Sequence, residues 1–301
     1  MSLPKTVTKG YLLKEFDTFV FDADGVLWTG DIPIPGAAQW INTLLDDPAK
    51  NVFITTNNST KTLEQYMQKV SKMGFERLGR DNLISPAIVL ASYFRQNAVK
   101  FHDKPVYLIG TENLKHTLEN DGGVRCFGVG NDYTEDYTDG DFIDEVDLTA
   151  QPTAVVVSFD SRFSYAKLMK AANFLANPDV EFLVCNEDST FPGPVKGMIL
   201  PETGPWSAAI QNVTGRKPTA VFGKPHKQMA NFLWLRANNL HPDRTVMFGD
   251  RLDTDMMFGK SNGFTTVWMQ TGVNTLSDIQ ATTDELKIPD FTCSFADFIN
   301  Q

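Results

Sequence analysis

Cysteine is scarce in this sequence, and long apolar runs are missing from it. The 301 residues include three cysteines, Cys126, Cys185 and Cys293, which lie far apart and without the short spacings of metal sites. An odd, sparse set argues against a disulfide framework and favours buried thiols in a reduced compartment. No stretch approaches the roughly 20 apolar residues of a membrane-spanning helix. Because residues 1–10 also lack the apolar core of a secretion signal, we expect a cytoplasmic protein with no membrane partner.

Basic side chains are outnumbered by acidic ones. The chain has 27 Lys and Arg against 37 Asp and Glu, which gives a formal net charge of −10 at pH 7. This balance disfavours nucleic acid and anionic membrane surfaces as partners. A small anionic substrate remains compatible with it, because a bound divalent cation and one lysine can reverse the potential inside a single cleft.

Short apolar strand patterns alternate with amphipathic helix patterns along the chain. Strands are predicted at 19–21, 52–54, 106–109, 154–159, 182–185, 220–222, 245–248 and 265–268. Helices are predicted at 37–45, 63–73, 85–97, 111–122 and 165–176, a loop at 128–147, and breaks at 192–194 and 201–205. This alternation predicts the α/β class, with a Rossmann-like, doubly wound parallel sheet. The middle third resembles a second α/β unit inserted into the first.

Two carboxylates follow the first predicted strand directly. The segment Val20–Trp28 contains Asp22 and Asp24, two residues apart, and then Gly25. A strand that ends in Asp-x-Asp-Gly places both acids at the carboxyl edge of the sheet, where open α/β folds keep their active sites. Two acids this close repel each other unless a cation or a proton lies between them. The alternative is a polar turn, because Asp and Gly are favoured turn residues.

Two other predicted strands end in groups suited to an anion. The segment Thr55–Ser59 offers hydroxyl, amide and helix-start N–H groups, which together can bind phosphate. Lys224 stands between Gly223 and Pro225, where the backbone restricts its position. The alternatives are an ordinary polar helix cap and a surface lysine in a turn.

A second acidic cluster follows the strand predicted at 245–248. It contains Asp250, Asp253 and Asp255. Helix capping would use only one or two such acids, and three of them beside Asp22 and Asp24 would be costly without a metal. Oxygen ligands of this kind suit Mg²⁺. The combined groups predict phosphoryl transfer through a carboxylate nucleophile, with the metal and lysine neutralising phosphate charge.

The four segments match, in order, the four motifs of the haloacid dehalogenase-like phosphatases, and the chain resembles that family. Within the family, the residues of these segments are most similar to the group of phosphoglycolate phosphatase, 4-nitrophenylphosphatase and pyridoxal-phosphate phosphatase. The resemblance implies that Asp22 is the nucleophile, which forms an aspartyl-phosphate. It implies that Asp24 is the general acid and base, and that its backbone carbonyl is a magnesium ligand beside the carboxylates of Asp22 and Asp250. Asp255 corresponds to a supporting acid that contacts these ligands and does not itself bind the metal.

The same resemblance assigns the remaining groups of the core. Thr56, together with Asn57 and Asn58, corresponds to the phosphate-binding loop. Lys224 corresponds to the lysine that orients the nucleophile and screens phosphate charge, so Thr56 and Lys224 count as both catalytic and substrate-binding.

The resemblance also implies a division of labour along the chain. Residues 1–104 and 218–301 would form the catalytic core, and residues 105–217 an α/β cap that selects the substrate and mediates a homodimer. In the cap loop 186–192, Asp188 and Phe191 are expected to face the substrate. The pyridoxal-phosphate enzymes carry histidine where Phe191 aligns, so 2-phosphoglycolate or 4-nitrophenyl phosphate is the favoured type of substrate, and pyridoxal phosphate the alternative.

Three other functions are compatible with parts of this pattern. A phosphomutase or phosphonate-type enzyme would carry its cap after the first motif, but the stretch from Asp24 to Thr56 is too short for a domain. A signalling receiver needs neither the second carboxylate nor the large insertion. A non-hydrolytic phosphoryl-binding module is the least favoured reading, because every acid and the lysine are present.

Overall fold

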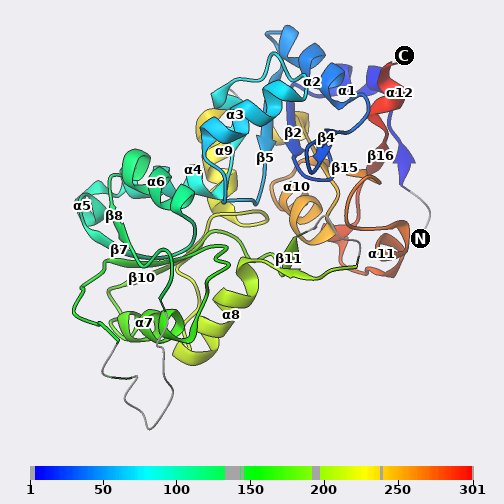
Figure 1. Ribbon diagram of the computed structural model, residues 1–301. Helices are drawn as coiled ribbons and strands as arrows, with labels where there is room; N and C mark the ends of the chain where they lie inside the picture. Colours follow the sequence, from blue (N-terminus) through cyan, green and yellow to red (C-terminus); the bar gives the residue numbers. More distant parts are fainter. Residues whose placement is uncertain (1–3, 133–142, 144–145, 192–196, 238–239, 300–301) are drawn as a thin grey trace. The chain divides into compact units, whose positions relative to one another are not determined.

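The computed structural model describes residues 4–132, 143, 146–191, 197–237 and 240–299. The chain divides into two compact units (Figure 1). Unit 1 comprises Met1–Thr56, Leu63–Ile84 and Lys224–Gln301, and unit 2 comprises Asn57–Thr62 and Ser85–Gly223. Unit 2 therefore starts earlier than the segment 105–217 expected from the sequence. It takes in α4 (Pro86–Gln96) and α5 (Ala98–Phe101), and α4 packs against α6 (Glu112–Gly122) of the same unit.

Unit 1 is built on a seven-stranded sheet in the order β1-β16-β15-β14-β2-β5-β6. All neighbouring strands in it are parallel. The strands are β1 (Lys5–Thr6), β2 (Thr18–Asp22), β5 (Asn51–Thr55), β6 (Leu83–Ile84), β14 (Thr245–Gly249), β15 (Thr265–Met269) and β16 (Phe291–Cys293), and a separate hairpin joins β3 (Trp28–Thr29) to β4 (Ile32–Pro33). The predicted parallel, doubly wound arrangement is confirmed.

Helices cover both faces of this sheet, and its central strands are therefore buried on both sides. On one face the rings of Phe21 and Phe248 stack at 4.5 Å, and Phe19 meets Trp40 of α2 edge to face. On the other face Gly259 of α10 approaches Met247. The helices of unit 1 are α1 (Lys9–Glu15), α2 (Ala37–Asp46), α3 (Leu63–Lys72), α9 (Lys227–Arg236), α10 (Met257–Ser261), α11 (Leu276–Ala281) and α12 (Phe295–Ile299), with short turns at Arg80–Asn82, Pro242–Arg244, Leu252–Met256 and Glu285–Lys287.

Unit 2 has its own parallel sheet, in the order β13-β10-β9-β7-β8. The strands are β7 (Pro105–Ile109), β8 (Arg125–Phe127), β9 (Ala154–Val157), β10 (Glu181–Val184) and β13 (Ala220–Val221), and β11 (Thr190–Phe191) and β12 (Leu200–Pro201) form an antiparallel pair. The remaining helices are α7 (Tyr165–Leu175) and α8 (Thr203–Thr214). A core of Val, Ile and aromatic side chains lies between this sheet and α7 and α8.

Two predictions from the sequence were wrong about this region. The strand expected at 220–222 is present as β13, but it pairs with β10 in the sheet of unit 2, whereas residues 218–301 were expected in the catalytic core. The proline-rich stretch 201–205, expected as a break, contains the start of α8 at Thr203. Pro205 is tolerated there because the first turn of a helix does not need its N–H groups. Most of the loop predicted at 128–147 and the break at 192–194 lie outside the described residues.

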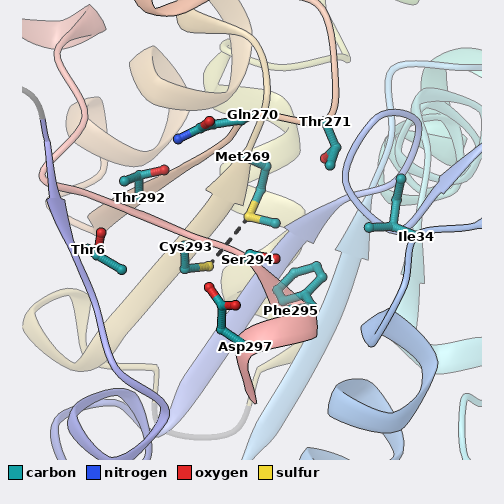
Figure 2. Close-up of a pocket in the computed structure, with 10 residues that line it drawn as sticks. All are labelled: Thr6, Ile34, Met269, Gln270, Thr271, Thr292, Cys293, Ser294, Phe295 and Asp297. Atoms are coloured by element: carbon teal, nitrogen blue, oxygen red, sulfur yellow. Dashed lines mark hydrogen bonds between the residues drawn. The ribbon is translucent and has the colours of Figure 1, made fainter. Parts of the chain in front are cut away.

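A cavity of about 270 Å³ lies beside the ends of β15 and β16 in unit 1 (Figure 2). In its lining, Cys293 Sγ donates to Met269 Sδ at 3.6 Å. As far as the chain is described, the lining of this cavity includes none of the predicted site residues. All three cysteines are buried and free, as expected. Among the described residues, no helix is both long and apolar enough to cross a membrane.

Candidate active site

Three predicted site residues follow adjacent strands of unit 1. Asp22 ends β2 and pairs in register with Thr55 of β5, so Thr56 is the next residue beyond the sheet. Phe248 of β14 pairs with Phe21, and Asp250 follows the end of that strand at Gly249. Because parallel strands present their carboxyl ends at one edge, the topology brings these groups together as the sequence predicts.

Lys224 joins two acids of this cluster. Its Nζ lies 2.5 Å from Asp22 Oδ1 and 2.7 Å from Asp255 Oδ1, and it donates to the carbonyl of Thr55 at 3.0 Å. The lysine is 2% exposed and Asp255 is 1% exposed. A buried charge must be paired to be stable, so this lysine belongs to the site and is not the surface lysine of the alternative reading.

Asp255 is held by the backbone as well. Its Oδ2 accepts from the backbone N–H groups of Asp250 and Arg251, both at 3.1 Å. With one oxygen on the lysine and the other on two amides, Asp255 fixes the loop that carries Asp250. This geometry suits the supporting role that the resemblance implies.

Asp250 lies in a narrow backbone cradle. Its Oδ2 accepts from the N–H of Val273 at 2.6 Å. A Cβ on Gly272 would approach Oδ2 to 1.8 Å, and one on Gly25, whose φ is +90°, would approach it to 2.7 Å. Glycine is therefore required at both positions. Within the described part of the chain, Asp250 Oδ1 is buried without a hydrogen-bond partner.

The donor set fits a hard divalent cation. Ligand oxygens of Asp22, Asp250 and Asp255 all lie within 4.8 Å of one another. Three buried carboxylates face one ammonium group, so the cluster carries an excess of negative charge that a divalent cation would balance. The orphaned Asp250 oxygen offers such a cation a ligand, since a buried polar atom is costly when it has no partner.

Burial and mutual repulsion shift the ionisation of the cluster. Burial raises the pKa of Asp22 well above its ordinary value, although the charge of Lys224 acts in the opposite direction. Burial, followed by the charge of Asp255, raises the pKa of Asp250 to about 7. Burial disfavours the charge on Lys224, but Asp22 and Asp255 outweigh it and raise the pKa of the lysine above its ordinary value. Groups perturbed this strongly at a sheet edge are typical of functional sites.

Asp24 is positioned by neighbours that the sequence did not reveal. The Nε1 of Trp28 donates to Asp24 Oδ1 at 2.9 Å, and the Nζ of Lys69 lies 3.9 Å from the same oxygen. The Asp24 side chain is 35% exposed. It can therefore exchange protons with a reactant while its orientation is held.

Thr56 is buried, and its backbone N–H donates to the carbonyl of Ile84 at 3.0 Å. Its side chain hydrogen-bonds the hydroxyl of Tyr66 on α3. Burial raises the pKa of Tyr66, so the phenol stays protonated. The signal for Tyr66 in the sequence was only helical periodicity, which predicts a core residue.

Asn57, Asn58 and the cap loop belong to unit 2. Asn57 Nδ2 donates to Asp188 Oδ1 at 3.1 Å, and Asn186 Nδ2 donates to the Asn57 carbonyl at 2.9 Å. Asn58 Oδ1 accepts from the N–H of Thr60 at 2.9 Å. The structure thus joins Asn57 to Asp188, while Asn58 stabilises a local turn.

Phe191 packs against another aromatic ring of unit 2. It is 37% exposed and contacts Phe159 edge to face at 5.5 Å between ring centroids. Pro192, the last residue of the cap loop 186–192, lies outside the described residues.

Comparisons with known proteins bear on this arrangement. The family model of the haloacid dehalogenase (HAD)-like hydrolases matches residues 19–123. A second family model, described as HAD-hydrolase-like, matches residues 221–294. The chain is 65% identical over 257 residues to a protein of Caenorhabditis elegans named for NipSnap, covering 85% of this chain. The match covers 48% of that protein, so the chain spans about half the length of that relative.

Other relatives are matched over most of their length. Glycerol-3-phosphate phosphatase of Rattus norvegicus is 34% identical, with 93% of this chain and 88% of that protein covered. Phosphoglycolate phosphatase 2 of Arabidopsis thaliana is 32% identical, with 96% and 94% covered. The crystal structure of a 4-nitrophenylphosphatase from Thermotoga maritima matches with a TM-score of 0.75 and 25% identity, over 96% of this chain and 98% of that one. The chain therefore belongs to the haloacid dehalogenase-like phosphatases, a family of phosphoric monoester hydrolases, as the four motifs predicted.

Proposed function

We propose that this protein hydrolyses small phosphate monoesters in a magnesium-dependent reaction that passes through an aspartyl-phosphate on Asp22. The observation that carries the proposal is the buried triad in which Lys224 contacts Asp22 at 2.5 Å and Asp255 at 2.7 Å. This contact holds the nucleophile and supplies positive charge where a phosphoryl group would arrive.

In the first half of the reaction, Asp22 attacks phosphorus through a carboxylate oxygen. The bond between phosphorus and the ester oxygen breaks, and Asp24 donates a proton to that leaving oxygen. In the second half, Asp24 takes a proton from water as the water attacks the same phosphorus. The bond from phosphorus to Asp22 then breaks, inorganic phosphate leaves, and both carboxyl groups return to their starting states.

The carboxylates of Asp22 and Asp250 and the backbone carbonyl of Asp24 would hold Mg²⁺, which supplies charge neutralisation for the phosphoryl oxygens. Ca²⁺ should inhibit, because it accepts more ligands at longer distances and can occupy both oxygens of Asp22. Titration of Ca²⁺ against fixed Mg²⁺ should show a competitive loss of rate. Full activity with Ca²⁺ alone, or after chelation of all divalent ions, would contradict this assignment.

The substrate is proposed to be a small ester whose phosphate meets Thr56 and Lys224. Relatives named for glycerol 3-phosphate and phosphoglycolate both match this chain. The cap loop Asn186–Phe191 carries Glu187 and Asp188 and no basic residue. That charge favours a neutral, hydroxyl-bearing leaving group such as glycerol over a carboxylate such as glycolate.

A substrate panel tests this function. We expect Mg²⁺-dependent hydrolysis of 4-nitrophenyl phosphate, with a higher kcat/KM for glycerol 3-phosphate than for 2-phosphoglycolate, and lower values again for pyridoxal phosphate. Preference for 2-phosphoglycolate or pyridoxal phosphate would reassign the substrate and leave the reaction class intact. Phosphate binding without turnover of any ester would favour a non-hydrolytic module instead.

We also propose a cytoplasmic homodimer that associates through unit 2, without nucleic-acid or membrane partners. Light scattering of the whole chain and of variants at exposed positions of unit 2 tests the dimer. A monomer at all concentrations would contradict it.

A further inference from the structure

Two groups approach the same oxygen of Asp24. The indole Nε1 of Trp28 donates to Oδ1 at 2.9 Å, and the Nζ of Lys69 lies 3.9 Å from that atom. An indole N–H is a donor only, so it can bond Oδ1 whether the carboxyl group is ionised or protonated. The proton that Asp24 exchanges with a reactant would then be carried on Oδ2.

The indole is fixed firmly enough to act as such an anchor. Trp28 is fully buried, and its ring meets Phe75 edge to face at 5.9 Å. Lys69 Nζ lies 4.8 Å from the centre of the indole, which adds a cation–π contact on its face.

The backbone also ties Trp28 to the Asp24 turn. The Trp28 carbonyl accepts from the N–H of Gly25 at 2.7 Å, and the Trp28 N–H donates to the carbonyl of Ala23 at 3.2 Å. The turn and the indole therefore move as one body, and the carboxyl group keeps its direction relative to the nucleophile two residues earlier.

We propose that Trp28 is a positioning residue for the general acid and base, because its indole holds Oδ1 of Asp24 and presents Oδ2 to the leaving oxygen and then to water. This inference rests on the proposed phosphatase reaction. Its particular consequence is that loss of the indole N–H should matter most where proton transfer matters most.

Trp28→Phe removes the N–H and keeps an aromatic ring. Trp40→Phe is the matched control, because Trp40 is buried in the same apolar core and, within the described residues, its indole nitrogen has no hydrogen-bond partner. A second variant carries 3-benzothienylalanine at position 28, which replaces the N–H by sulfur at nearly the same shape. This variant keeps the test valid if the phenylalanine leaves a damaging cavity. Circular dichroism and Tm report folding for all three.

The readout is kcat/KM across esters with good and poor leaving groups, because this constant reports the first phosphoryl transfer. For both variants at position 28 we expect glycerol 3-phosphate hydrolysis to fall about 10- to 100-fold, which is part of the roughly 10²–10⁴-fold that acid catalysis contributes. The kcat/KM for 4-nitrophenyl phosphate should stay within about 3-fold of wild type, because the nitrophenolate leaving group needs no proton. A burst of nitrophenolate should now precede the steady state with this substrate. Trp40→Phe should leave the ratio of the two substrates unchanged.

An equal loss for both esters in the position-28 variants, or no loss in either, would overturn the role of Trp28 while leaving the phosphatase function standing. A wild-type protein that hydrolyses neither ester would overturn the proposed function, and this inference with it.

Discussion

The Nζ of Lys224 lies 2.5 Å from Oδ1 of Asp22, although 202 positions separate the two residues in the sequence. Both are buried, and the lysine is bound at the same time by Asp255. The pair therefore depends on the complete fold of unit 1, in which residues after 224 return to complete the site begun by β2. We therefore expect this one contact to contribute to both the stability and the activity of the protein.

Replacement of Lys224 by Met should lower both stability and activity. It would leave Asp22 and Asp255 buried without their cation, and loss of one partner of a buried pair typically costs about 3–5 kcal/mol. Urea unfolding and kcat/KM for 4-nitrophenyl phosphate measure the two effects.

Lys167→Met is the matched control for this change. Lys167 is equally buried and lies 2.5 Å from Asp160 in unit 2. It should lose stability to a similar degree while its folded fraction keeps normal kinetic constants. A Lys224→Met enzyme with normal kcat/KM would contradict the catalytic role of the lysine.

Asp24→Asn should preserve binding of phosphate esters and lose proton transfer. General acid–base assistance is typically worth about 10²–10⁴ in rate. In a pre-steady-state measurement of the first phosphoryl transfer, the loss should be smallest for 4-nitrophenyl phosphate. If good and poor leaving groups suffer equally, Asp24 is not the acid.

The pH dependence of stability in the metal-free protein should reveal Asp250. Its pKa is about 7 in the fold against an ordinary value of 3.8, so folding favours the protonated form. The contribution of this group is therefore most favourable below about pH 4 and is lost as pH rises to about 7, by an amount on the order of a few kcal/mol. The free energy of unfolding in EDTA, taken as wild type minus Asp250→Asn, measures it.

Mg²⁺ should remove this loss, because the cation stabilises the ionised carboxylate. At pH 8 the wild-type Tm should rise with Mg²⁺, while the Tm of Asp250→Asn should rise much less. A difference between the two proteins that stays flat from pH 4 to pH 7 in EDTA would show that Asp250 is not desolvated as the structure indicates.

Much of the core site could be predicted, because the residue that follows each strand can be recognised from the local sequence. Asp22, Thr56 and Asp250 each follow an apolar run, and parallel pairing alone brings such positions to one edge. The two-residue strand β13 (Ala220–Val221) gave no such guidance, since a short apolar run does not specify which sheet it joins. Its placement in unit 2 therefore came only from the structure.

The residues that support the site were not predictable, because their roles depend on tertiary packing. Trp28 and Tyr66 have the sequence appearance of ordinary core aromatics, and only the fold shows their polar atoms at Asp24 and Thr56. Asn57 was predicted as a phosphate ligand, and the structure also gives it a bond to Asp188, a partner 131 positions away. Pattern reasoning along the chain cannot supply contacts at that separation.

Phe191→His should change which ester is cleaved without changing metal dependence. Phe191 is an exposed residue of the short strand β11, at the end of a segment of mixed polar and aromatic side chains, and a repositioned side chain shifts specificity by about 1–3 kcal/mol. The ratio of kcat/KM for pyridoxal phosphate to that for 4-nitrophenyl phosphate should rise. Ile199→His, at an exposed position beside β12, is the control and should leave the ratio unchanged. Uniform scaling of both rates by Phe191→His would place substrate choice elsewhere in unit 2.

The most direct test of the account is identification of the residue that is phosphorylated during turnover. Enzyme quenched in acid during steady-state hydrolysis, then reduced with borohydride, converts an aspartyl-phosphate into homoserine that mass spectrometry can locate. Homoserine is expected at position 22 of the wild type, and neither homoserine nor turnover is expected in Asp22→Asn. Asp253→Asn, which changes an exposed acid of the same region, should behave as wild type. Modification of another residue, or normal hydrolysis by Asp22→Asn, would contradict the account.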